Sequence, residues 1–371
     1  MSKARYIMVG GFLGAGKTTA IIKLAEQLQS EGHKVGLITN DQSIGLVDTA
    51  MAAAHDFPVE EITGGCFCCR FNSLLDASRN LTRDVQPDIF LAEPVGSCTD
   101  LKATVSFPLR QMYGDDFAIA PLSVLVDPIR AMRILGLTPG KNFSEKVSYI
   151  YLKQLEEAEI IVINKSDLLT QEQLDGLTDA LKKRFPMARV LHASARQGTN
   201  LDSWLQLIRS SELAPGESME VDYDTYAAGE ALLGWMNCAA TLSSGAEFDG
   251  NAFLKRLAMD LQARLKSAAA EVAHLKMTLS PAEGNDLAVL NLVRNDYQPE
   301  LSHKLAEPVA EGELLVNLRA EIAPEFLREA TRETLAAVAR DAGVKVEIDQ
   351  LEAFRPGRPT PTHRLARVCE E

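Results

Sequence analysis

The 371-residue sequence lacks any apolar stretch close to the length of about 20 residues that a membrane-spanning helix requires. The apolar run that precedes the first glycines is also shorter than the core of a signal peptide. We therefore expect a cytoplasmic protein with no membrane partner.

Cysteine and histidine are both scarce. Six cysteines are too few for a disulfide framework, and a reducing compartment would not keep one oxidised. The six histidines are scattered, which excludes a histidine-rich metal-storage tract. Basic residues are outnumbered, with 38 Lys and Arg against 51 Asp and Glu, and the net charge of −13 argues against a general nucleic-acid partner.

The remaining composition is typical of a soluble globular protein, with 46% hydrophobic and 24% charged residues, and the length predicts two domains. In residues 1–212, short runs rich in Val, Ile and Leu alternate with segments of helical periodicity. This alternation predicts an α/β fold with a doubly wound, mainly parallel sheet. The expected strands are 6–9, 35–39, 89–92, 122–126, 160–163 and 190–192, and the expected helices are 18–30, 73–83, 144–155, 171–184 and 201–210.

A Pro-Gly turn near residue 215 precedes a different pattern, which predicts a smaller α+β domain over residues 220–354. It resembles a ferredoxin-like sandwich, a largely antiparallel sheet with two helices on one face, plus one extra strand. Residues 355–371 are basic and rich in proline, so they should be extended. This tail is either solvated, or an arm that grips a partner or folds back to place an Arg or His near a phosphate.

Residues 11–18 read Gly-Phe-Leu-Gly-Ala-Gly-Lys-Thr and match the phosphate-binding P-loop pattern between an expected strand and an expected helix. The glycines let backbone N–H groups face phosphate oxygens, and the helix N-terminus adds positive potential. Lys17 would act on the β- and γ-phosphates as a catalytic residue, and the Thr18 hydroxyl would bind Mg²⁺. The predicted nucleotide-binding residues here are Gly11, Gly14, Ala15, Gly16, Lys17, Thr18 and Thr19.

Two further segments, each directly after an expected strand, are predicted to bind the base of the nucleotide. Asn164, Lys165 and Asp167 come after the strand at 160–163, where a carboxylate would accept both guanine donors while its neighbours brace the loop. The ordinary alternative is a polar helix cap. Because a P-loop precedes it, the motif favours GTP over ATP. Ser194 and Ala195, after the next strand, would contact the base through backbone amides.

Glu93 and Gly96 follow the strand at 89–92, at the edge of the sheet where such folds bind ligands. Glu93 would hold Mg²⁺ through water or orient the attacking water, and Gly96 would let the backbone approach the γ-phosphate. The alternative for Glu93 is a surface carboxylate beside a proline turn.

Cys66, Cys68 and Cys69 lie in one loop after Gly64 and Gly65. Three thiolates would hold a zinc-type ion and leave one position open, as in an exchangeable site. The alternatives are small buried hydrophobic residues or a redox pair.

Together, the P-loop, the Gly-Gly-Cys-x-Cys-Cys loop, Glu93-x-x-Gly96 and Asn164-Lys-x-Asp167 resemble the CobW-type P-loop GTPases, relatives of the hydrogenase and urease nickel-insertion GTPases. The resemblance covers about the first 210 residues. It implies a GTP-hydrolysing metallochaperone whose cysteines bind Zn²⁺ or Co²⁺ between two switch regions, with nucleotide state controlling metal affinity.

The first switch departs from the family pattern. Asp41 stands where the family usually has Glu, and the aromatic residue that follows in the family is missing. We assign Asp41 a catalytic role and make it the leading candidate for a fourth metal ligand. Pro94 also replaces the usual Thr or Ser after Glu93.

The leading hypothesis is therefore a GTPase with Mg²⁺ as cofactor that delivers Zn²⁺ or Co²⁺ to a client metalloenzyme. The alternative is a regulatory GTPase that assembles or reactivates a cobalamin-dependent or other cofactor-dependent enzyme without metal transfer. A small-molecule kinase is a weaker third reading. The sequence leaves the client, the metal and formation of a homodimer open.

Overall fold

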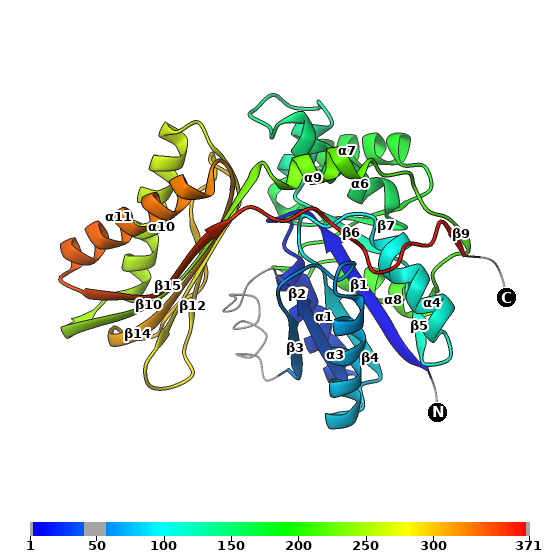
Figure 1. Ribbon diagram of the computed structural model, residues 1–371, viewed down its shortest axis with the longest axis horizontal. Helices are drawn as coiled ribbons and strands as arrows, with labels where there is room; N and C mark the ends of the chain where they lie inside the picture. The colour runs from blue at the N-terminus through cyan, green and yellow to red at the C-terminus, as the bar shows by residue number, and fades with distance from the viewer. Residues whose placement is uncertain (1–2, 41–56, 369–371) are drawn as a thin grey trace. The chain divides into compact units, whose positions relative to one another are not determined.

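The computed structural model describes residues 3–40 and 57–368. The chain divides into two compact units (Figure 1). Among the described residues, the first unit comprises 3–40, 57–227 and 359–368, and the second comprises 228–358. The predicted domain limits at 212, 220 and 354 stay predictions.

The first unit is built on a parallel sheet with the strand order β3-β2-β4-β1-β6-β7-β8, and β5 also pairs with β1. Its inner strands, such as β7, are buried along their whole length because helices cover both faces. The strands are β1 (Ala4–Gly11), β2 (Val35–Asn40), β3 (Val59–Ile62), β4 (Ile89–Glu93), β5 (Phe117–Ile119), β6 (Ser123–Val126), β7 (Ile160–Ile163) and β8 (Arg189–His192).

Helix boundaries in the first unit follow local capping chemistry. Thr170 and Gln173 form a reciprocal capping box at the start of α7, and Asp127 caps α5 immediately before Pro128. The helices are α1 (Lys17–Ser30), α3 (Phe71–Asp84), α4 (Phe107–Tyr113), α5 (Pro128–Ile134), α6 (Glu145–Glu157), α7 (Gln171–Arg184) and α8 (Leu201–Ser210), with a π-helical turn η1 (Lys102–Ser106) and a 3₁₀ turn η2 (Ser166–Leu168). Helix α9 (Tyr223–Glu230) contains the division between the two units at residue 227.

The second unit is an antiparallel sheet with the order β13-β12-β11-β14-β10-β15. Its two helices pack against each other, and both lie on one face of the sheet (Figure 1). The elements are β10 (Leu233–Phe248), α10 (Gly250–Ser267), β11 (Glu271–Pro281), β12 (Ala288–Leu292), β13 (Glu300–His303), β14 (Val309–Glu321), α11 (Pro324–Ala342) and β15 (Lys345–Phe354). Without β12 and β13 the order is that of a split βαβ sandwich.

The two-part fold class predicted from the sequence is confirmed, but one detail of the second unit is wrong. Two strands rather than one are added to the sandwich, because β13 pairs with β12 as a hairpin. With only four residues, none of them fully buried, β13 has no apolar pattern that could have revealed it.

Residues 359–368, here called the C-terminal strap, belong to the first unit and end in β16 (Arg367–Val368), which pairs with β9 (Gly216–Glu217). The strap is extended as predicted, but it is not a solvated tail. Its backbone hydrogen bonds reach Cys68, Ala103 and Ser218.

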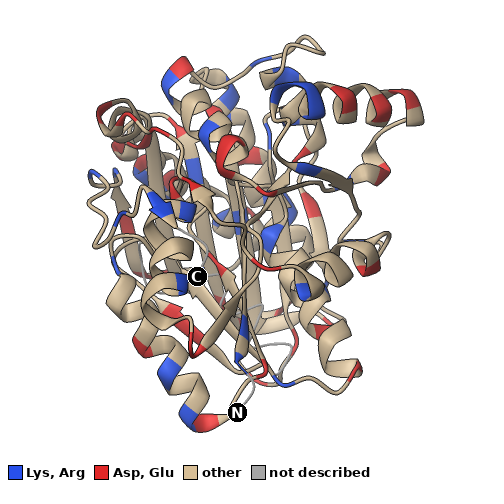
Figure 2. Cartoon of the chain, turned by 90° about the vertical axis from the view of Figure 1, so that its right-hand side faces the viewer, with Lys and Arg blue, Asp and Glu red and all other residues tan. Residues whose placement is uncertain are grey.

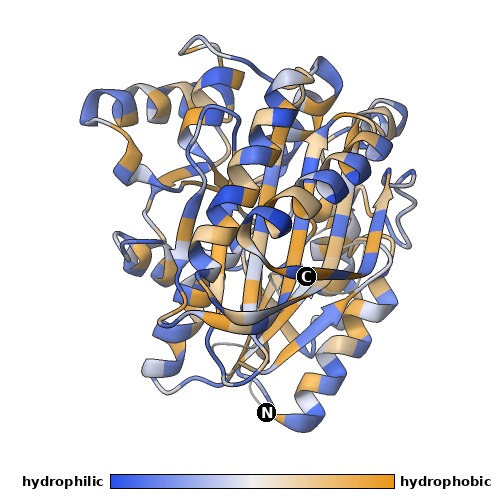
Figure 3. Cartoon of the chain, turned by 90° about the vertical axis from the view of Figure 1, so that its left-hand side faces the viewer, coloured by the Kyte–Doolittle hydropathy of each residue, from blue (hydrophilic) through white to orange (hydrophobic). Residues whose placement is uncertain are grey.

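Charges of both signs are interspersed over the described chain (Figure 2). Hydrophobic and hydrophilic residues alternate along its helices and strands (Figure 3). No helix within 3–40 and 57–368 is both long and apolar enough to cross a membrane.

Candidate functional site

The phosphate-binding loop connects β1 to α1. Gly14 and Gly16 have φ angles of +80° and +89°, in the left-handed region that favours glycine. A Cβ on Gly16 would lie 2.5 Å from Nδ2 of Asn164, and a Cβ on Gly11 would lie 2.4 Å from the carbonyl oxygen of Leu125. Gly16 therefore lets the loop approach Asn164, whereas Gly11 lets β1 lie against β6.

Lys17, Thr18 and Glu93 meet at the carboxyl edge of the sheet. The Thr18 hydroxyl donates a hydrogen bond to Oε1 of Glu93 at 3.1 Å, and Lys17 Nζ lies 3.7 Å from the same oxygen. All three side chains are buried. A hydroxyl and a carboxylate beside a P-loop are the oxygen donors that suit Mg²⁺, so the residues present fit this ion. Thr19 lies half-buried in the first turn of α1.

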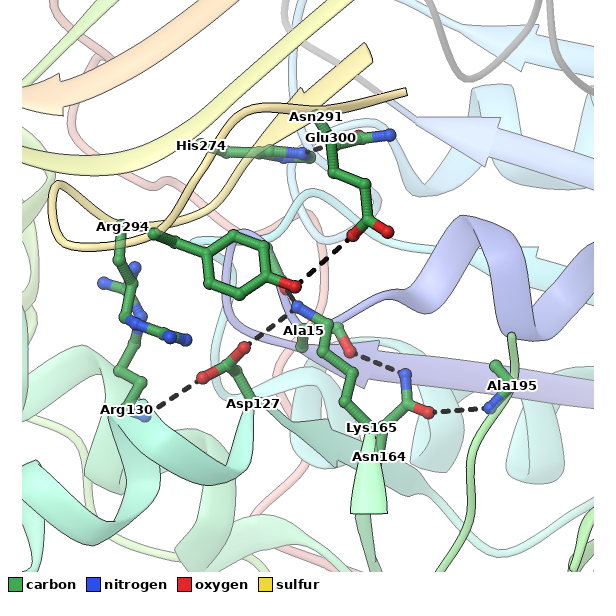
Figure 4. A network of polar contacts seen from close by, with 12 residues as sticks. Ala15, Asp127, Arg130, Asn164, Lys165, Ala195, His274, Asn291, Arg294 and Glu300 are labelled. Carbon is green, nitrogen blue, oxygen red and sulfur yellow. Dashed lines mark hydrogen bonds and ion pairs between the residues drawn. The ribbon is translucent and has the colours of Figure 1, made fainter. Parts of the chain in front are cut away.

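Asn164 joins the phosphate loop to the loop that follows β8. Its Nδ2 donates to the carbonyl of Ala15 at 2.8 Å, and its Oδ1 accepts from the backbone N–H of Ala195 at 3.0 Å (Figure 4). The side chain is buried, so both contacts form away from water. Asn164 is therefore a brace between these loops, as predicted.

Lys165 has a left-handed backbone conformation, with φ of +53°. Its Nζ donates to the carbonyl of Gly14 at 2.7 Å and pairs with Oδ2 of Asp127 at 2.9 Å (Figure 4). Asp127 is buried and also accepts from the backbone N–H of Arg130. Asp127 was not among the predicted site residues, although it directly follows the apolar strand expected at 122–126 and therefore lies at the same edge of the sheet.

Asp167 lies in η2, two residues after Lys165, and its side chain is exposed. The preceding residue, Ser166, donates its N–H to the carbonyl of Ala193, so the two predicted base-binding loops are in contact. Ser194 is buried, and its hydroxyl accepts from the N–H of Gln197 at 3.3 Å. An exposed carboxylate beside a braced loop is free to meet a base from solvent.

The turn after Glu93 lies against the phosphate loop. A Cβ on Gly96 would come within 3.1 Å of the backbone nitrogen of Leu13. The buried side chain of Gln154, from α6, holds this turn by donating to the carbonyls of Gly96 at 3.0 Å and Cys98 at 2.8 Å. Gln154 was not predicted, because on the sequence it is one polar residue within a helix.

The thiols of Cys66, Cys68 and Cys69 converge. Their sulfur atoms lie 2.9 Å (Cys66–Cys68), 3.3 Å (Cys66–Cys69) and 3.7 Å (Cys68–Cys69) apart. Gly64 and Gly65, with φ of +72° and +153°, supply the bend that brings the thiols together. Among the described residues, these three cysteines form a group of potential metal ligands whose sulfur atoms all lie within 4.8 Å of one another.

The thiols differ in acidity. Hydrogen bonds with Cys68, Cys69 and Cys98 hold the pKa of Cys66 well below its ordinary value. Hydrogen bonding to Cys66 and Cys69, together with burial, raises the pKa of Cys68 well above its ordinary value. The pKa of Cys69 is raised, chiefly by its hydrogen bond with Cys66. Cys66 is therefore the first thiolate that a metal ion would meet.

Asn40, the last residue of β2, holds the cysteine loop. Its Nδ2 donates to the carbonyls of Ile62 at 2.9 Å and Gly65 at 2.7 Å, and its Oδ1 accepts from the N–H of Phe67 at 2.9 Å. Asp41, the predicted catalytic residue and fourth ligand, lies outside the described residues. The contacts of Asn40 nevertheless tie the residue before Asp41 to the cysteine loop.

The C-terminal strap covers the other side of this loop. The N–H of Thr360 donates to Sγ of Cys69 at 3.2 Å, and the N–H of Thr362 donates to the carbonyl of Cys68 at 2.8 Å. His363 packs edge-on against Phe71. Further along, Arg364 forms an ion pair with Asp100 at 2.7 Å, so the strap reaches the segment after Glu93. Arg364 and His363 thus contact Asp100 and Phe71.

Relatives with curated names match about half of this chain. It is 30% identical over 171 residues to the zinc chaperone YeiR of Escherichia coli K12, which covers 46% of the chain and 49% of the relative. It is 25% identical over 196 residues to the zinc chaperone CobW of Sinorhizobium sp, covering 48% and 55%. The chain thus spans about half the length of the curated relatives it matches.

Two solved structures are also similar. HypB from Helicobacter pylori in complex with nickel has a TM-score of 0.41 and 17% identity, covering 55% of this chain and 84% of that one. Zn(II)-bound YjiA GTPase from E. coli has a TM-score of 0.37 and 17% identity, covering 92% and 99%.

Residues 5–192 match the family described as CobW/HypB/UreG, nucleotide-binding domain. The match begins within β1 and ends with β8, so it contains the phosphate loop, the cysteine loop and the loop of Asn164. The resemblance drawn from the motifs is confirmed, and this chain belongs to the CobW/HypB/UreG family of P-loop GTPases.

Proposed function

We propose that this protein is a GTP-hydrolysing metallochaperone that binds Zn²⁺ or Co²⁺ at Cys66, Cys68 and Cys69 and delivers the metal to a client metalloenzyme. The observation that carries the proposal is the connection between two sites of one unit. Asn40 holds the cysteine loop, and its neighbour Thr39 on β2 pairs in register with Glu93 on β4. The names of the zinc chaperones YeiR and CobW support the metal assignment.

The phosphate side of the proposal rests on Lys17, Thr18 and Glu93. The Lys17 ammonium would offset charge that develops on the β- and γ-phosphates, and the loop glycines would let backbone N–H groups face them. Thr18 and Glu93 would hold Mg²⁺, which when bound neutralises phosphate charge. Glu93, through its position beside Lys17, would orient the attacking water.

Guanine selection would come from Asp167, whose carboxylate matches the paired N1–H and N2–H₂ donors of that base. Asn164 and Lys165 fix the backbone around it through their contacts with Ala15 and Gly14. A base contact through the amides of Ser194 and Ala195 would require both to exchange partners, because the N–H of Ser194 donates to the carbonyl of Thr199 and that of Ala195 to Oδ1 of Asn164.

Nucleotide state would change metal affinity through these connections. The γ-phosphate and Mg²⁺ order switch segments, and hydrolysis releases them. The cysteine loop is attached at Asn40 to the first expected switch segment, residues 40–48. The pairing of Thr39 with Glu93 connects it to the start of the second expected segment, residues 93–96, so its geometry should follow both. Coupling of this kind is typically about 1–3 kcal/mol, or roughly 5–150-fold in affinity.

The decisive experiment measures Zn²⁺ affinity against a competing chelator, with a non-hydrolysable GTP analogue and with GDP. We expect the two affinities to differ by at least about 5-fold, with equal reciprocal effects of Zn²⁺ on nucleotide affinity. Because the ligands bind as thiolates, binding should also release protons and weaken as the pH falls.

The triple variant Cys66→Ser/Cys68→Ser/Cys69→Ser should lose tight binding, whereas Cys238→Ser in the second unit serves as the matched buried control. Tight Zn²⁺ and Co²⁺ binding by the triple variant would overturn the metallochaperone proposal. Equal metal affinity in both nucleotide states would instead favour the regulatory GTPase without metal transfer.

A second experiment tests hydrolysis. Lys17→Ala should remove most GTP turnover, while Lys23→Ala, which changes a half-exposed lysine on the same helix, should leave it intact. Phosphate release under single-turnover conditions is the readout, and unchanged hydrolysis in Lys17→Ala would show that the P-loop is not the catalytic centre.

A further inference from the structure

The C-terminal strap lies over the most exposed thiol of the three. Cys66 and Cys68 are buried, whereas Cys69 is half-buried. The strap contacts Cys69 twice, because the N–H of Thr360 donates to its Sγ at 3.2 Å and the hydroxyl of Thr362 donates to its carbonyl at 3.2 Å. A metal ion that reaches or leaves the three thiols from the side of Cys69 must therefore pass the strap.

The middle of the strap buries little apolar surface. Its ends, Pro359 and Val368, are buried. Most of the side chains between them are exposed, at positions 360, 362, 364, 366 and 367. A segment with few buried apolar contacts and hydrogen bonds close to solvent opens locally at a low cost in free energy. The middle of the strap can therefore separate from the cysteine loop while both ends stay in place.

An ion pair fixes the strap two residues beyond Thr362. Nε of Arg364 donates to Oδ2 of Asp100 at 2.7 Å, and its Nη2 donates to the carbonyl of Met219 at 2.9 Å. Asp100 is 1% exposed, and the hydroxyl of Tyr223 donates to the same Oδ2 at 2.7 Å. A buried carboxylate is strongly destabilised when its cation is removed, so this pair resists separation.

We propose that the strap is a gate for metal exchange at the three thiols, and that Arg364 is the positioning residue that keeps the gate closed by its ion pair with Asp100. This inference rests on the proposed function, because the gated ion is the metal that these thiols hold. Arg364 acts through the strap and not as a ligand. While the pair is formed, Thr360 stays on Cys69, and when it separates, this thiol is open to an incoming ion or to a competing ligand.

A gate differs from a metal ligand in its kinetics. Opening the path speeds both the uptake and the withdrawal of the ion, so their ratio, and with it the affinity, changes little. Loss of a ligand instead speeds withdrawal alone and weakens affinity. Separate measurement of the two rates therefore tests the role assigned to Arg364.

The test uses the full chain without nucleotide, with stopped-flow measurement of Zn²⁺ uptake and of its withdrawal by EDTA. Arg364→Gln should speed both on the order of 10-fold and change Zn²⁺ affinity by less than about 3-fold, because it removes a charge-assisted hydrogen bond of the strap. Arg364→Lys keeps the positive charge and should restore most of the slow exchange. Arg367→Gln makes the same substitution at an exposed position in β16 and should exchange like the wild type.

Asp100→Asn removes the other half of the pair. Asp100 has a φ angle of +65°, which asparagine tolerates well. This variant should match Arg364→Gln, and the double variant should exchange no faster than either, because both substitutions break one interaction. In metal-free protein the same variants should speed alkylation of Cys69, resolved by mass spectrometry. Urea unfolding checks that each variant folds.

Equal uptake and withdrawal rates in the wild type and in folded Arg364→Gln and Asp100→Asn would overturn the gate and leave the proposed function standing. Faster withdrawal with unchanged uptake would also overturn the gate, because the substitutions would then weaken the site without opening it. Tight Zn²⁺ binding by Cys66→Ser/Cys68→Ser/Cys69→Ser would instead overturn the proposed function, and the gate with it.

Discussion

Glu157, near the end of α6, is a buried carboxyl whose protonation should set the pH dependence of stability. Its Oε1 accepts from the Thr99 hydroxyl at 3.1 Å, and its Oε2 accepts from the N–H of Lys102 at 2.9 Å. Burial, with a contribution from the negative charge of Asp100, raises the pKa of Glu157 to about 8. Both partners belong to the segment between β4 and α4, so the carboxyl ties α6 to that segment.

The sign of the effect follows from the two pKa values. The unfolded chain should have a Glu157 pKa near the ordinary 4.5, against about 8 in the folded protein. Between these values the folded state keeps a proton that the unfolded state has lost. The free energy of unfolding should therefore fall by about 1.4 kcal/mol per pH unit as the pH rises through this window. Below it the contribution is fully present, and above it the contribution is lost.

Glu157→Gln should remove this dependence, because an amide imitates the protonated carboxyl. Its oxygen can accept from the N–H of Lys102, and its NH₂ can face the Thr99 hydroxyl. Urea unfolding at about pH 5.5 and pH 7.5 should show the wild type losing about 3 kcal/mol relative to the variant. Glu156→Gln, at an exposed neighbouring position, is the control and should follow the wild type.

Parallel stability curves for the wild type and Glu157→Gln would refute the reasoning. They would mean that Glu157 is ionised in the folded protein throughout this range, so that its two hydrogen bonds outweigh burial.

Three further perturbations test the site. Asp167→Asn should weaken GTP binding and favour xanthosine triphosphate, because the new amide presents a donor to the base. Competition between the two nucleotides measures this preference. A wild type that hydrolyses ATP as well as GTP would contradict the guanine assignment. Gly16→Ala should destabilise the phosphate loop by about 1–3 kcal/mol, because its Cβ would clash with Asn164 and the φ angle is positive. Thermal unfolding measures this loss, and an unchanged melting temperature would contradict the loop geometry. Truncation after residue 358 should speed alkylation of Cys69 relative to the full-length Cys369→Ser variant, because the strap no longer contacts it. An unchanged rate would contradict that role.

The proximity of residues on the P-loop side could be expected from the sequence because a parallel sheet brings strand ends to one edge. Lys17, Glu93 and Asn164 each follow an apolar run, and their convergence needs only the strand order. Helices α7 and α8 were also predicted with their observed bounds. The start of α7 is marked by the capping box of Thr170 and Gln173.

The site residues that were not predicted from the sequence depend on bends and on tertiary contacts. Gln154 and Asp127 carry no motif, and their roles arise only when α6 and β6 are placed beside the phosphate loop. The convergence of Cys66, Cys68 and Cys69 needs the bend at Gly64 and Gly65. That bend has no periodicity that can be read along the chain.

The membership of the C-terminal strap in the first unit has a consequence for synthesis on the ribosome. About 130 residues of the second unit must be translated between α9 and the strap, which takes roughly 6–26 s at typical elongation rates of about 5–20 residues per second. During that interval the nascent first unit has its complete parallel sheet but lacks the segment that covers Cys69 and pairs with Asp100. The cysteine loop therefore remains accessible to metal, oxidants and folding factors until residues 359–368 emerge.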